Sequence, residues 1–536
     1  IQLAKKKIEE SGTYAQLQTE SLMAWKEIWD RIDVQVSGDR LVQKMIRLHL
    51  YHTMVSVSPH SRDYATGIPA RGLHGEAYRG HIFWDELYVM PFFNFNFPDT
   101  ARSALLYRHQ RLPAARRLAR KEGVSGAMFP WQSGSSGREE SQLLHLNPRS
   151  GKWGPDHSHL QRHVSLAIAY NLWQYLWLSD DREFLAEAGA ELFLEICLFW
   201  SSMASCPPES DRFSIDRVMG PDEFHEHYPD SENGGLKNNA YTNLMVVWLF
   251  NRAFDLLSLL PENRKITLLS ELEIRPEELE RWKYLSHNLT VPISEEGILE
   301  QFEGYFDLKE LDWDHYNKKY DDIHRMDRIL KAEGHSPNEY KVAKQADALM
   351  LFYNLPEGQV VELLNQLRYT PPENLLERNF HYYLQRTSHG STLSRLVHAY
   401  LAHLVGNYAL SRKLYREALQ SDYIDIQGGT TQEGIHLGVM TGTALFAIRT
   451  YAGLNWIGEK LSLNPHLPEG WKKIKFNIDF RGCRYFFNIK HNKVNIKLVG
   501  DQPGSIYLLG QEYQLNPGEW KKIKINHKPV NTGDLE

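Results

Sequence analysis

The chain has 536 residues, with 61 Lys or Arg against 67 Asp or Glu, so its formal charge is −6 at pH 7. This mildly acidic balance excludes nucleic acid as the main partner, because phosphate backbones are bound by clustered Lys and Arg. No apolar run reaches the roughly 18 residues of a membrane-spanning helix. The three cysteines lack CxxC spacing, which argues against disulfides and structural zinc and predicts a reducing, cytoplasmic location.

Residues 1–37 are predicted to form a charged helical linker rather than a domain. The chain begins at Ile1 without Met or a signal peptide, so we interpret it as part of a longer product. From residue 38 to residue 455 the pattern is helical. Val164, Ile168 and Leu172 recur every four residues, and 241–256 and 393–404 show similar spacing. Roughly a dozen such segments without alternating strands predict a mainly α domain and exclude a doubly wound sheet or TIM barrel.

Past residue 455 the apolar period changes to two. The stretches 476–480 and 494–498 alternate apolar and polar residues, and Pro, Gly and Asn separate the runs. This pattern predicts a small antiparallel β domain over residues 456–536.

A crowded acidic segment is the first candidate for chemistry. Asp222, Glu223 and Glu226 lie within five residues, beside Phe224 and His225. Like charges and an apolar wall raise the pKa of a carboxyl group, which is how a general acid stays protonated near neutral pH. On composition alone, a solvated acidic turn after a proline is about as good an interpretation.

Two loops rich in Gly, Ser and Thr are candidates for anion binding. Residues 427–436 and 387–391 each precede an apolar stretch with helical spacing. Backbone N–H groups and hydroxyls at a helix start bind oxyanions, although most such loops are ordinary N-caps.

Two further segments could bind a sugar. Trp84 and Asp85 pair a stacking ring with a carboxylate acceptor, and Lys344 and Gln345 add donors at a predicted helix start. The alternatives are a core Trp with a helix-capping Asp, and an exposed helical turn. The histidines do not form HExxH or another metal spacing, so no catalytic metal is predicted.

Five segments, in their order and spacing, carry a family resemblance. They are 79–85, 220–223 together with 238–243, 344–347, 387–391 and 429–436. They resemble the motifs of inverting glycoside hydrolase family 65, which contains maltose, kojibiose, nigerose and trehalose phosphorylases. The resemblance runs from about residue 1 to the end of the chain.

The resemblance implies an (α/α)6 barrel over residues 38–455, a C-terminal β domain and an N-terminal β-sandwich that this chain would lack. It also implies a homodimer. By motif, Glu223 would be the general acid, and Trp84, Asp85, Lys344 and Gln345 would hold the glucosyl ring. The implied phosphate-binding residues are Ser388, His389, Gly390, Gly429, Thr430 and His436.

The expected reaction is therefore attack of inorganic phosphate on an α-glucosyl disaccharide, with inversion to β-glucose 1-phosphate. Phosphate is a co-substrate, and no other cofactor is expected. A phosphate dianion is already nucleophilic, so donors that position it are sufficient.

Two alternatives remain at this point. Hydrolysis by a kojibiose- or trehalose-cleaving type of enzyme would use Glu433 as the base, although a carboxylate favoured by a helix dipole is an equal interpretation of that residue. A carbohydrate-binding protein with a decayed site is the other. The acceptor sugar is expected to be selected by loops such as 127–134 and 301–305.

Overall fold

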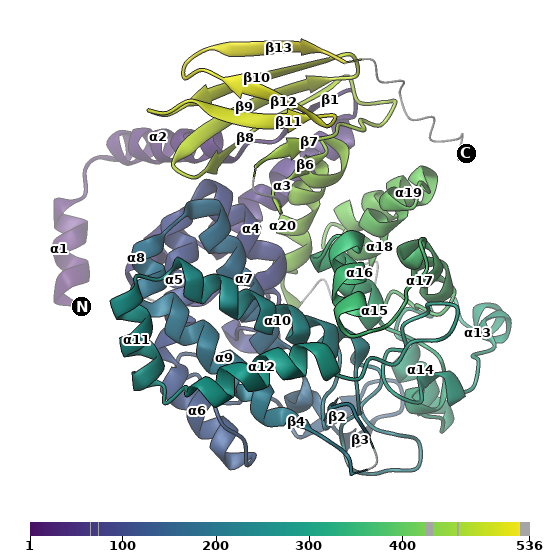
Figure 1. Ribbon diagram of the computed structural model, residues 1–536. Helices are drawn as coiled ribbons and strands as arrows, with labels where there is room; N and C mark the ends of the chain where they lie inside the picture. The colour runs from purple at the N-terminus through teal and green to yellow at the C-terminus, as the bar shows by residue number, and fades with distance from the viewer. Residues whose placement is uncertain (65, 73, 209, 425–432, 458–459, 526–536) are drawn as a thin grey trace.

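Helices from along the chain pack into a closed ring, and Figure 1 shows where they lie. The protein is represented by a computed structural model that describes residues 1–64, 66–72, 74–208, 210–424, 433–457 and 460–525. Within these residues each ring helix packs against the next, and the last packs against the first. The ring consists of α4 (Glu86–Asn96), α7 (Val164–Ser179), α10 (Ala240–Leu259), α15 (Asp347–Asn354), α18 (Thr392–Leu404) and α20 (Leu437–Phe446).

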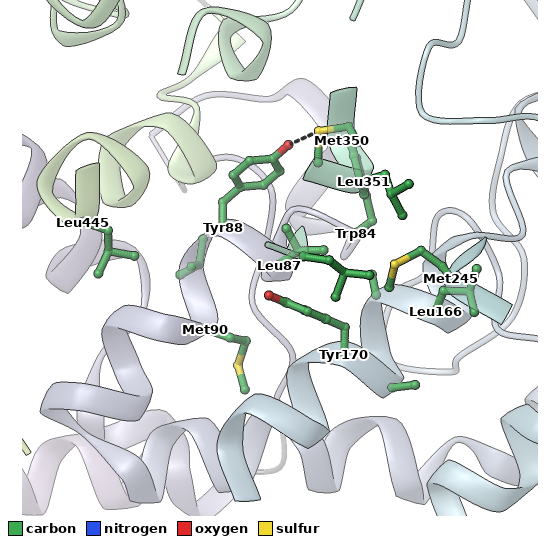
Figure 2. Close-up of a cluster of buried hydrophobic side chains, with 14 of the residues drawn as sticks. Trp84, Leu87, Tyr88, Met90, Leu166, Tyr170, Met245, Met350, Leu351 and Leu445 are labelled. Atoms are coloured by element: carbon green, nitrogen blue, oxygen red, sulfur yellow. Dashed lines mark hydrogen bonds between the residues drawn. The ribbon is translucent and has the colours of Figure 1, made fainter. Parts of the chain in front are cut away.

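Two of the ring helices, α4 and α20, are buried on almost every side. Every residue of α20 is buried, and so is every residue of α4 except Pro91. A helix that is covered all round needs no polar face, which explains the nearly continuous apolar runs in these segments. Figure 2 shows side chains from several ring helices meeting in this core, where the Tyr88 hydroxyl donates to the sulfur of Met350 at 3.1 Å.

An outer layer of helices covers the ring. Each of its members packs against one or two ring helices. They are α3 (Arg40–Ser56), α5 (Pro98–Gln110), α9 (Ala190–Met203), α12 (Pro276–Asn288), α17 (Leu375–Leu384) and α19 (Tyr408–Leu419). Over the described ranges, six inner and six outer helices form an (α/α)6 barrel, so the predicted fold class is confirmed.

The barrel span contains more helices than the roughly dozen that periodicity indicated. The additional ones are short or lie in connections: α6 (Leu112–Lys121), α8 (Arg182–Phe184), α11 (Glu262–Glu271), α13 (Trp313–Lys319), α14 (Met326–Glu333) and α16 (Glu357–Gln366). Two hairpins, which the helical pattern did not reveal, join β2 (Leu144–Asn147) to β3 (Lys152–Pro155) and β4 (Ala204–Ser205) to β5 (Ser214–Ile215).

The C-terminal region forms two sheets above the barrel (Figure 1). One has the order β1-β8-β9-β10-β13, and the other has the order β12-β11-β7-β6. The strands are β6 (Leu454–Asn455), β7 (Ser462–Leu463), β8 (Lys473–Phe480), β9 (Cys483–Lys490), β10 (Lys493–Val499), β11 (Gly504–Leu508), β12 (Gln511–Leu515) and β13 (Trp520–Lys524). Strict alternation of burial along β8 matches the predicted period of two. One pair, β7 with β11, is parallel, whereas only antiparallel pairing was expected.

The first 37 residues contribute to both regions. They form α1 (Gln2–Glu10), α2 (Tyr14–Ile32) and β1 (Gln35–Ser37). Strand β1 pairs with β8, and Arg31 forms an ion pair with Asp479 at 2.7 Å, so this segment is attached to the C-terminal sheet. None of the helices described is long and apolar enough to cross a membrane.

Candidate active site

A cavity of about 600 Å³ opens at one end of the barrel. Residues from the segments leading into all six ring helices line it: Asp85, Ser158, Glu223, Gln345, Gly390 and His436. Helix N-termini carry partial positive charge and free N–H groups, so this end of the barrel suits anionic ligands.

The loop that carries Glu223 is fixed by its neighbours. The Asp222 carboxylate accepts from the backbone N–H of Lys344 at 2.7 Å and contacts His225 Nδ1 at 2.6 Å, while its own N–H donates to Asp347 at 2.6 Å. A Cβ on Gly220 would lie 1.8 Å from Asp347 Oδ2, so only glycine fits this close approach. Asp222 therefore positions the loop and is not a second acid facing the cavity.

Glu223, on the same loop, lines the cavity, and its carboxyl group lies next to Lys344. Its φ of 64° lies in the left-handed region that bulky residues rarely adopt. Lys344 Nζ lies 2.7 Å from Glu223 Oε2, and both side chains are only partly exposed. Strained backbone at a carboxyl group held by tertiary contacts is typical of a functional site, and the solvated-turn interpretation does not fit.

Trp84 and Asp85 lie on the same cavity. Trp84 is 3% exposed, with its ring edge-on to Tyr88 and His163 at centroid distances of 5.8 and 4.8 Å. Asp85 occupies the N-cap position of α4, but its side chain makes no capping hydrogen bond. Burial first, and the charge of Glu223 second, raise the pKa of Asp85 to about 7. A carboxylate that does not cap its helix and lines the cavity beside a buried ring fits a sugar better than a capping role.

The side-chain amide of Gln345 is hydrogen-bonded through its nitrogen but not through its oxygen. Its Nε2 donates to the Pro221 carbonyl at 2.7 Å, whereas the buried Oε1 has no hydrogen-bond partner among the described residues. A buried unpaired acceptor is costly, so a ligand hydroxyl would be a favourable partner.

The predicted phosphate-binding residues divide into three groups. Gly390 and His436 line the cavity. Ser388 and His389 do not: the Ser388 hydroxyl donates to the carbonyls of His324 and Ala343, and His389 Nδ1 contacts the Ser394 hydroxyl at 3.0 Å. Gly429 and Thr430 lie outside the described residues.

Glu433 lines the cavity and pairs with an arginine that sequence reasoning missed. Arg71 Nη2 lies 3.2 Å from Glu433 Oε2, and Arg71 Nη1 donates to the Gly434 carbonyl at 2.8 Å. Helix α20 begins only at Leu437 and has no acidic residue in its first turn. The helix-dipole interpretation of Glu433 is therefore wrong.

Of the two predicted acceptor loops, only one reaches the cavity. Trp131 and Gln132 line it, but no residue of 301–305 does. Gln301 is fully buried and caps α15 by accepting from the Asp347 N–H at 2.8 Å. The expectation that residues 301–305 contact the acceptor sugar was thus incorrect, because this loop packs beneath the cavity wall and supports helix α15.

Sequence reasoning also missed the contribution of α14. Arg325, Arg328 and Lys331, at its start and along its length, line the cavity. Their i, i+3 spacing was a signal that could have found them. Among the residues described, no group of three or more His, Cys, Asp or Glu could hold a metal ion.

Comparison with known protein families assigns this chain to a family. The glycosyl hydrolase family 65 central catalytic domain matches residues 47–445, and the C-terminal domain of the same family matches residues 454–515. The chain belongs to glycosyl hydrolase family 65. The resemblance carried by the five sequence motifs is thereby confirmed.

Curated relatives cover most of this family 65 chain. It is 46% identical over 478 residues to an uncharacterized glycosyl hydrolase of Mycobacterium tuberculosis, covering 89% of this chain and 36% of that protein. It is 43% identical over 515 residues to the trehalose 6-phosphate phosphorylase of Lactococcus lactis, covering 95% and 65%. A kojibiose phosphorylase of Caldanaerobacter subterraneus is 32% identical over 507 residues, covering 92% and 61%. The chain therefore spans between about a third and two thirds of these relatives.

A solved structure supports the fold. A candidate kojibiose phosphorylase from the human microbiome superposes with a TM-score of 0.81 at 23% identity, covering 98% of this chain and 72% of that one. At this identity the match concerns the barrel and the sheets alone.

Proposed function

We propose that this family 65 protein catalyses inverting phosphorolysis of an α-glucosyl disaccharide. The observation that carries the proposal is that Glu223 and Asp85 line one cavity with Gly390 and His436. The cavity thus combines a proton donor, a sugar-binding carboxylate and candidate phosphate donors. Each of these roles is a proposal supported by position and by motif.

The reaction needs one proton donor and one external nucleophile. Glu223 gives its proton to the glycosidic oxygen as the bond from that oxygen to the anomeric carbon breaks. Phosphate forms the new bond to that carbon from the opposite face, which gives β-glucose 1-phosphate and a free acceptor sugar. The proton that phosphate loses returns to Glu223 through solvent.

Asp85 and Gln345 are suited to hold the glucosyl ring. A carboxylate accepts two hydroxyl hydrogen bonds, and the unused Oε1 of Gln345 accepts another. Trp84 supplies an apolar wall beside them. Positioning of this kind is worth several orders of magnitude in rate, because the sugar is held for in-line attack.

Phosphate would lie near Gly390, His436 and the loop before α20. A Cβ on Gly390 would come within 2.6 Å of the His324 carbonyl and 3.1 Å of Lys344 Cγ, so a side chain does not fit at this position of the cavity wall. His436 donates its N–H to Asp422 at 2.6 Å, and Arg71 keeps His436 and Glu433 together.

Hydrolysis is less well supported. Glu433 reaches the cavity, as a base would have to, but its carboxylate forms an ion pair with Arg71 at 3.2 Å. Two of the relatives described above are named as phosphorylases, of trehalose 6-phosphate and of kojibiose.

Phosphate dependence tests the proposal directly. Kojibiose, trehalose and trehalose 6-phosphate form the first panel, because relatives are named after their phosphorolysis. Each is incubated with and without inorganic phosphate, and the products are followed by NMR of the anomeric proton. We expect cleavage only with phosphate and a β-configured glucose 1-phosphate. Equal release of free glucose without phosphate would establish hydrolysis instead.

Three further expectations accompany this proposal. We propose a homodimer acting in the cytoplasm, with phosphate as the only small-molecule requirement besides the disaccharide. The family resemblance and the cysteine pattern support these expectations, and light scattering of the purified protein tests the dimer.

A further inference from the structure

The cavity contains a second group of cations, on α14 (Met326–Glu333). Arg325, Arg328 and Lys331 are spaced three residues apart, so they lie along one face of the helix, and all three line the cavity. None of them belongs to the family motifs that suggested the site for inorganic phosphate.

Two of these cations have carboxylate partners. Arg325 donates to Asp327 through Nε at 3.0 Å and Nη2 at 2.7 Å, and Lys331 donates to Glu226 at 3.0 Å. A guanidinium has five N–H donors, so Arg325 keeps donors for a ligand. The partners hold both side chains in place without using all of their hydrogens.

Arg328 differs from its neighbours. Its side chain has no hydrogen bond and no ion pair in the described ranges, and its Nε is buried without a partner. Burial and the nearby charge of Arg325 lower its pKa. A buried N–H without a partner is costly, and a guanidinium that lines a cavity with its remaining N–H donors uncommitted is suited to a bidentate anion such as a phosphate group.

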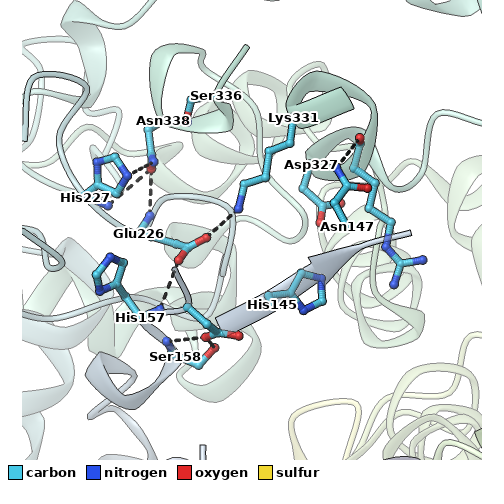
Figure 3. Close-up of polar contacts among 12 residues, drawn as sticks. His145, Asn147, His157, Ser158, Glu226, His227, Asp327, Lys331, Ser336 and Asn338 are labelled. Carbon is cyan, nitrogen blue, oxygen red and sulfur yellow. Dashed lines mark hydrogen bonds and ion pairs between the residues drawn. The ribbon is translucent and has the colours of Figure 1, made fainter. Parts of the chain in front are cut away.

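The opposite side of this region comes from the β2–β3 hairpin. His145 on β2 lines the cavity together with Lys331 and Glu226, and Figure 3 labels all three side chains in one view. Burial lowers the pKa of His145, and the charges of Arg325 and Lys331 contribute in the same direction. The α14 cations and the hairpin therefore border one region of the cavity.

Helix α14 lies on the side of the cavity that carries the general acid. Phe224, next to Glu223, packs in one apolar cluster with Met326, Ile329 and Leu330 of α14. The Lys331–Glu226 ion pair joins α14 to the same loop, and the charge of Glu223 raises the pKa of Arg325. The general acid protonates the leaving oxygen, so the acceptor sugar lies on this side and the nucleophile lies on the other.

We propose that Arg328, flanked by Arg325 and Lys331, forms a second anion site that binds the phosphate group of a phosphorylated acceptor sugar. The substrate class is then an α-glucosyl disaccharide carrying a phosphate ester on the acceptor half. This inference rests on the proposed function for its reaction, but the site itself is defined by the α14 side chains.

Inorganic phosphate is the other ligand that could bind to the α14 cations, because it presents the same anionic oxygens as a phosphate ester. Arg328 also lies near enough to Glu433 for that carboxylate to act on its pKa, so the two anion sites are close. The experiment must therefore separate the acceptor phosphate from the phosphate that attacks.

The test compares the wild-type protein with Arg328→Gln and with the control Arg117→Gln, an exposed arginine on α6 that does not line the cavity. Trehalose 6-phosphate and trehalose serve as substrates at saturating inorganic phosphate, and the KM for phosphate is measured separately. We expect Arg328→Gln to lower kcat/KM for the phosphorylated disaccharide about 10- to 100-fold, the size of a lost charge-assisted contact. Its kcat/KM for trehalose and its KM for inorganic phosphate should change by less than about 3-fold.

A binding measurement separates this inference from the proposed function. Glucose 6-phosphate, glucose and inorganic phosphate are added to the same three proteins, and thermal stabilisation is recorded. We expect stabilisation by glucose 6-phosphate well above that by glucose, lost in Arg328→Gln and kept in Arg117→Gln. Binding of this kind without phosphorolysis would contradict the proposed function and support the second site. Equal effects of glucose and glucose 6-phosphate, or an Arg328→Gln defect confined to the KM for inorganic phosphate, would overturn the second site.

Discussion

Lys344 Nζ lies 2.7 Å from Glu223 Oε2, and the backbone N–H of Lys344 donates to Asp222 at 2.7 Å. One lysine thus holds both neighbouring carboxyl groups of the acid loop, through its side chain and through its backbone. This relationship orients Glu223 toward the cavity while Asp222 stays in the scaffold.

Glu223→Gln should abolish phosphorolysis of natural disaccharides while leaving ligand-induced thermal stabilisation largely intact. An amide keeps the shape but cannot donate a proton to the leaving oxygen, and loss of general acid catalysis costs about 10²- to 10⁴-fold in rate. The control is Glu232→Gln, an exposed residue farther along the same loop. Full activity of Glu223→Gln would show that another group is the acid.

Gly220→Ala should displace the acid loop. The new methyl group would lie 1.8 Å from Asp347 Oδ2 and 2.5 Å from Asn239 Nδ2, so the hydrogen bonds that support Glu223 must shift. We expect a loss of about 1–3 kcal/mol in the free energy of unfolding and a lower kcat. The matched control is Gly358→Ala on α16, where a Cβ meets nothing within 4 Å; urea unfolding should show it neutral or slightly more stable. Equal behaviour of the two variants would contradict the close packing.

Stability should depend on the ionisation of Asp85. Its pKa, raised from 3.8 to about 7, means that the folded protein keeps a proton that the unfolded chain releases between those pH values. Its contribution to stability is therefore present at low pH and decreases as the pH rises toward 7. The Asn side chain of Asp85→Asn stays neutral at every pH, so the variant does not share this loss of stability. The difference in free energy of unfolding, variant minus wild type, should therefore rise by on the order of 1–3 kcal/mol from pH 4.5 to pH 7.5.

The control for this comparison is Asp211→Asn, an exposed carboxylate outside the cavity. Its difference from the wild type should stay constant across the same pH range. Urea unfolding at several pH values gives all three curves. A constant difference for Asp85→Asn as well would show that the pKa of Asp85 is not raised.

Arg71→Gln should weaken the use of inorganic phosphate. Arg71 is 5% exposed and joins Glu433 and Gly434 to the cavity wall. Its loss should raise the KM for phosphate by about 10-fold or more, because a charge-assisted contact is worth roughly 1.5–3 kcal/mol. The KM for the disaccharide at saturating phosphate should change much less. An unchanged KM for phosphate in a folded Arg71→Gln protein would show that inorganic phosphate does not bind near Arg71.

Much of the architecture could be predicted from local patterns. The four-residue spacing from Val164 to Leu172 corresponds to α7, and the alternation in 476–480 and 494–498 corresponds to β8 and β10. The period of two follows from burying one face of a sheet, and the four-residue spacing reflects the helical repeat of about 3.6 residues per turn. The short hairpins and α14 were missed because their apolar contacts come from distant segments, which no local period records.

The site was predicted in outline by its ordered motifs. Glu223, Asp85, Lys344 and Gln345 line the cavity together, and a motif shared with a family carries that information without any structure. Ser388 and His389 follow the same motif logic, yet their side chains contact neighbouring carbonyls, the Ser394 hydroxyl and His398. Side-chain direction depends on the backbone of other segments, so a motif alone cannot supply it.

By itself the sequence predicted a mainly helical span with a β region after it, and its ordered motifs indicated the family and, through it, the barrel and Glu223 as the candidate general acid. These properties rest on period, composition and ordered motifs, which are local features of the chain. Only the tertiary structure decided that Asp222 points into the scaffold, that Arg71 pairs with Glu433, and that the Nε of Arg328 is buried without a partner among the described residues. The reason is physical: pairing, burial and the resulting charge of a site are set by groups that lie far apart in the chain and meet only when the barrel closes.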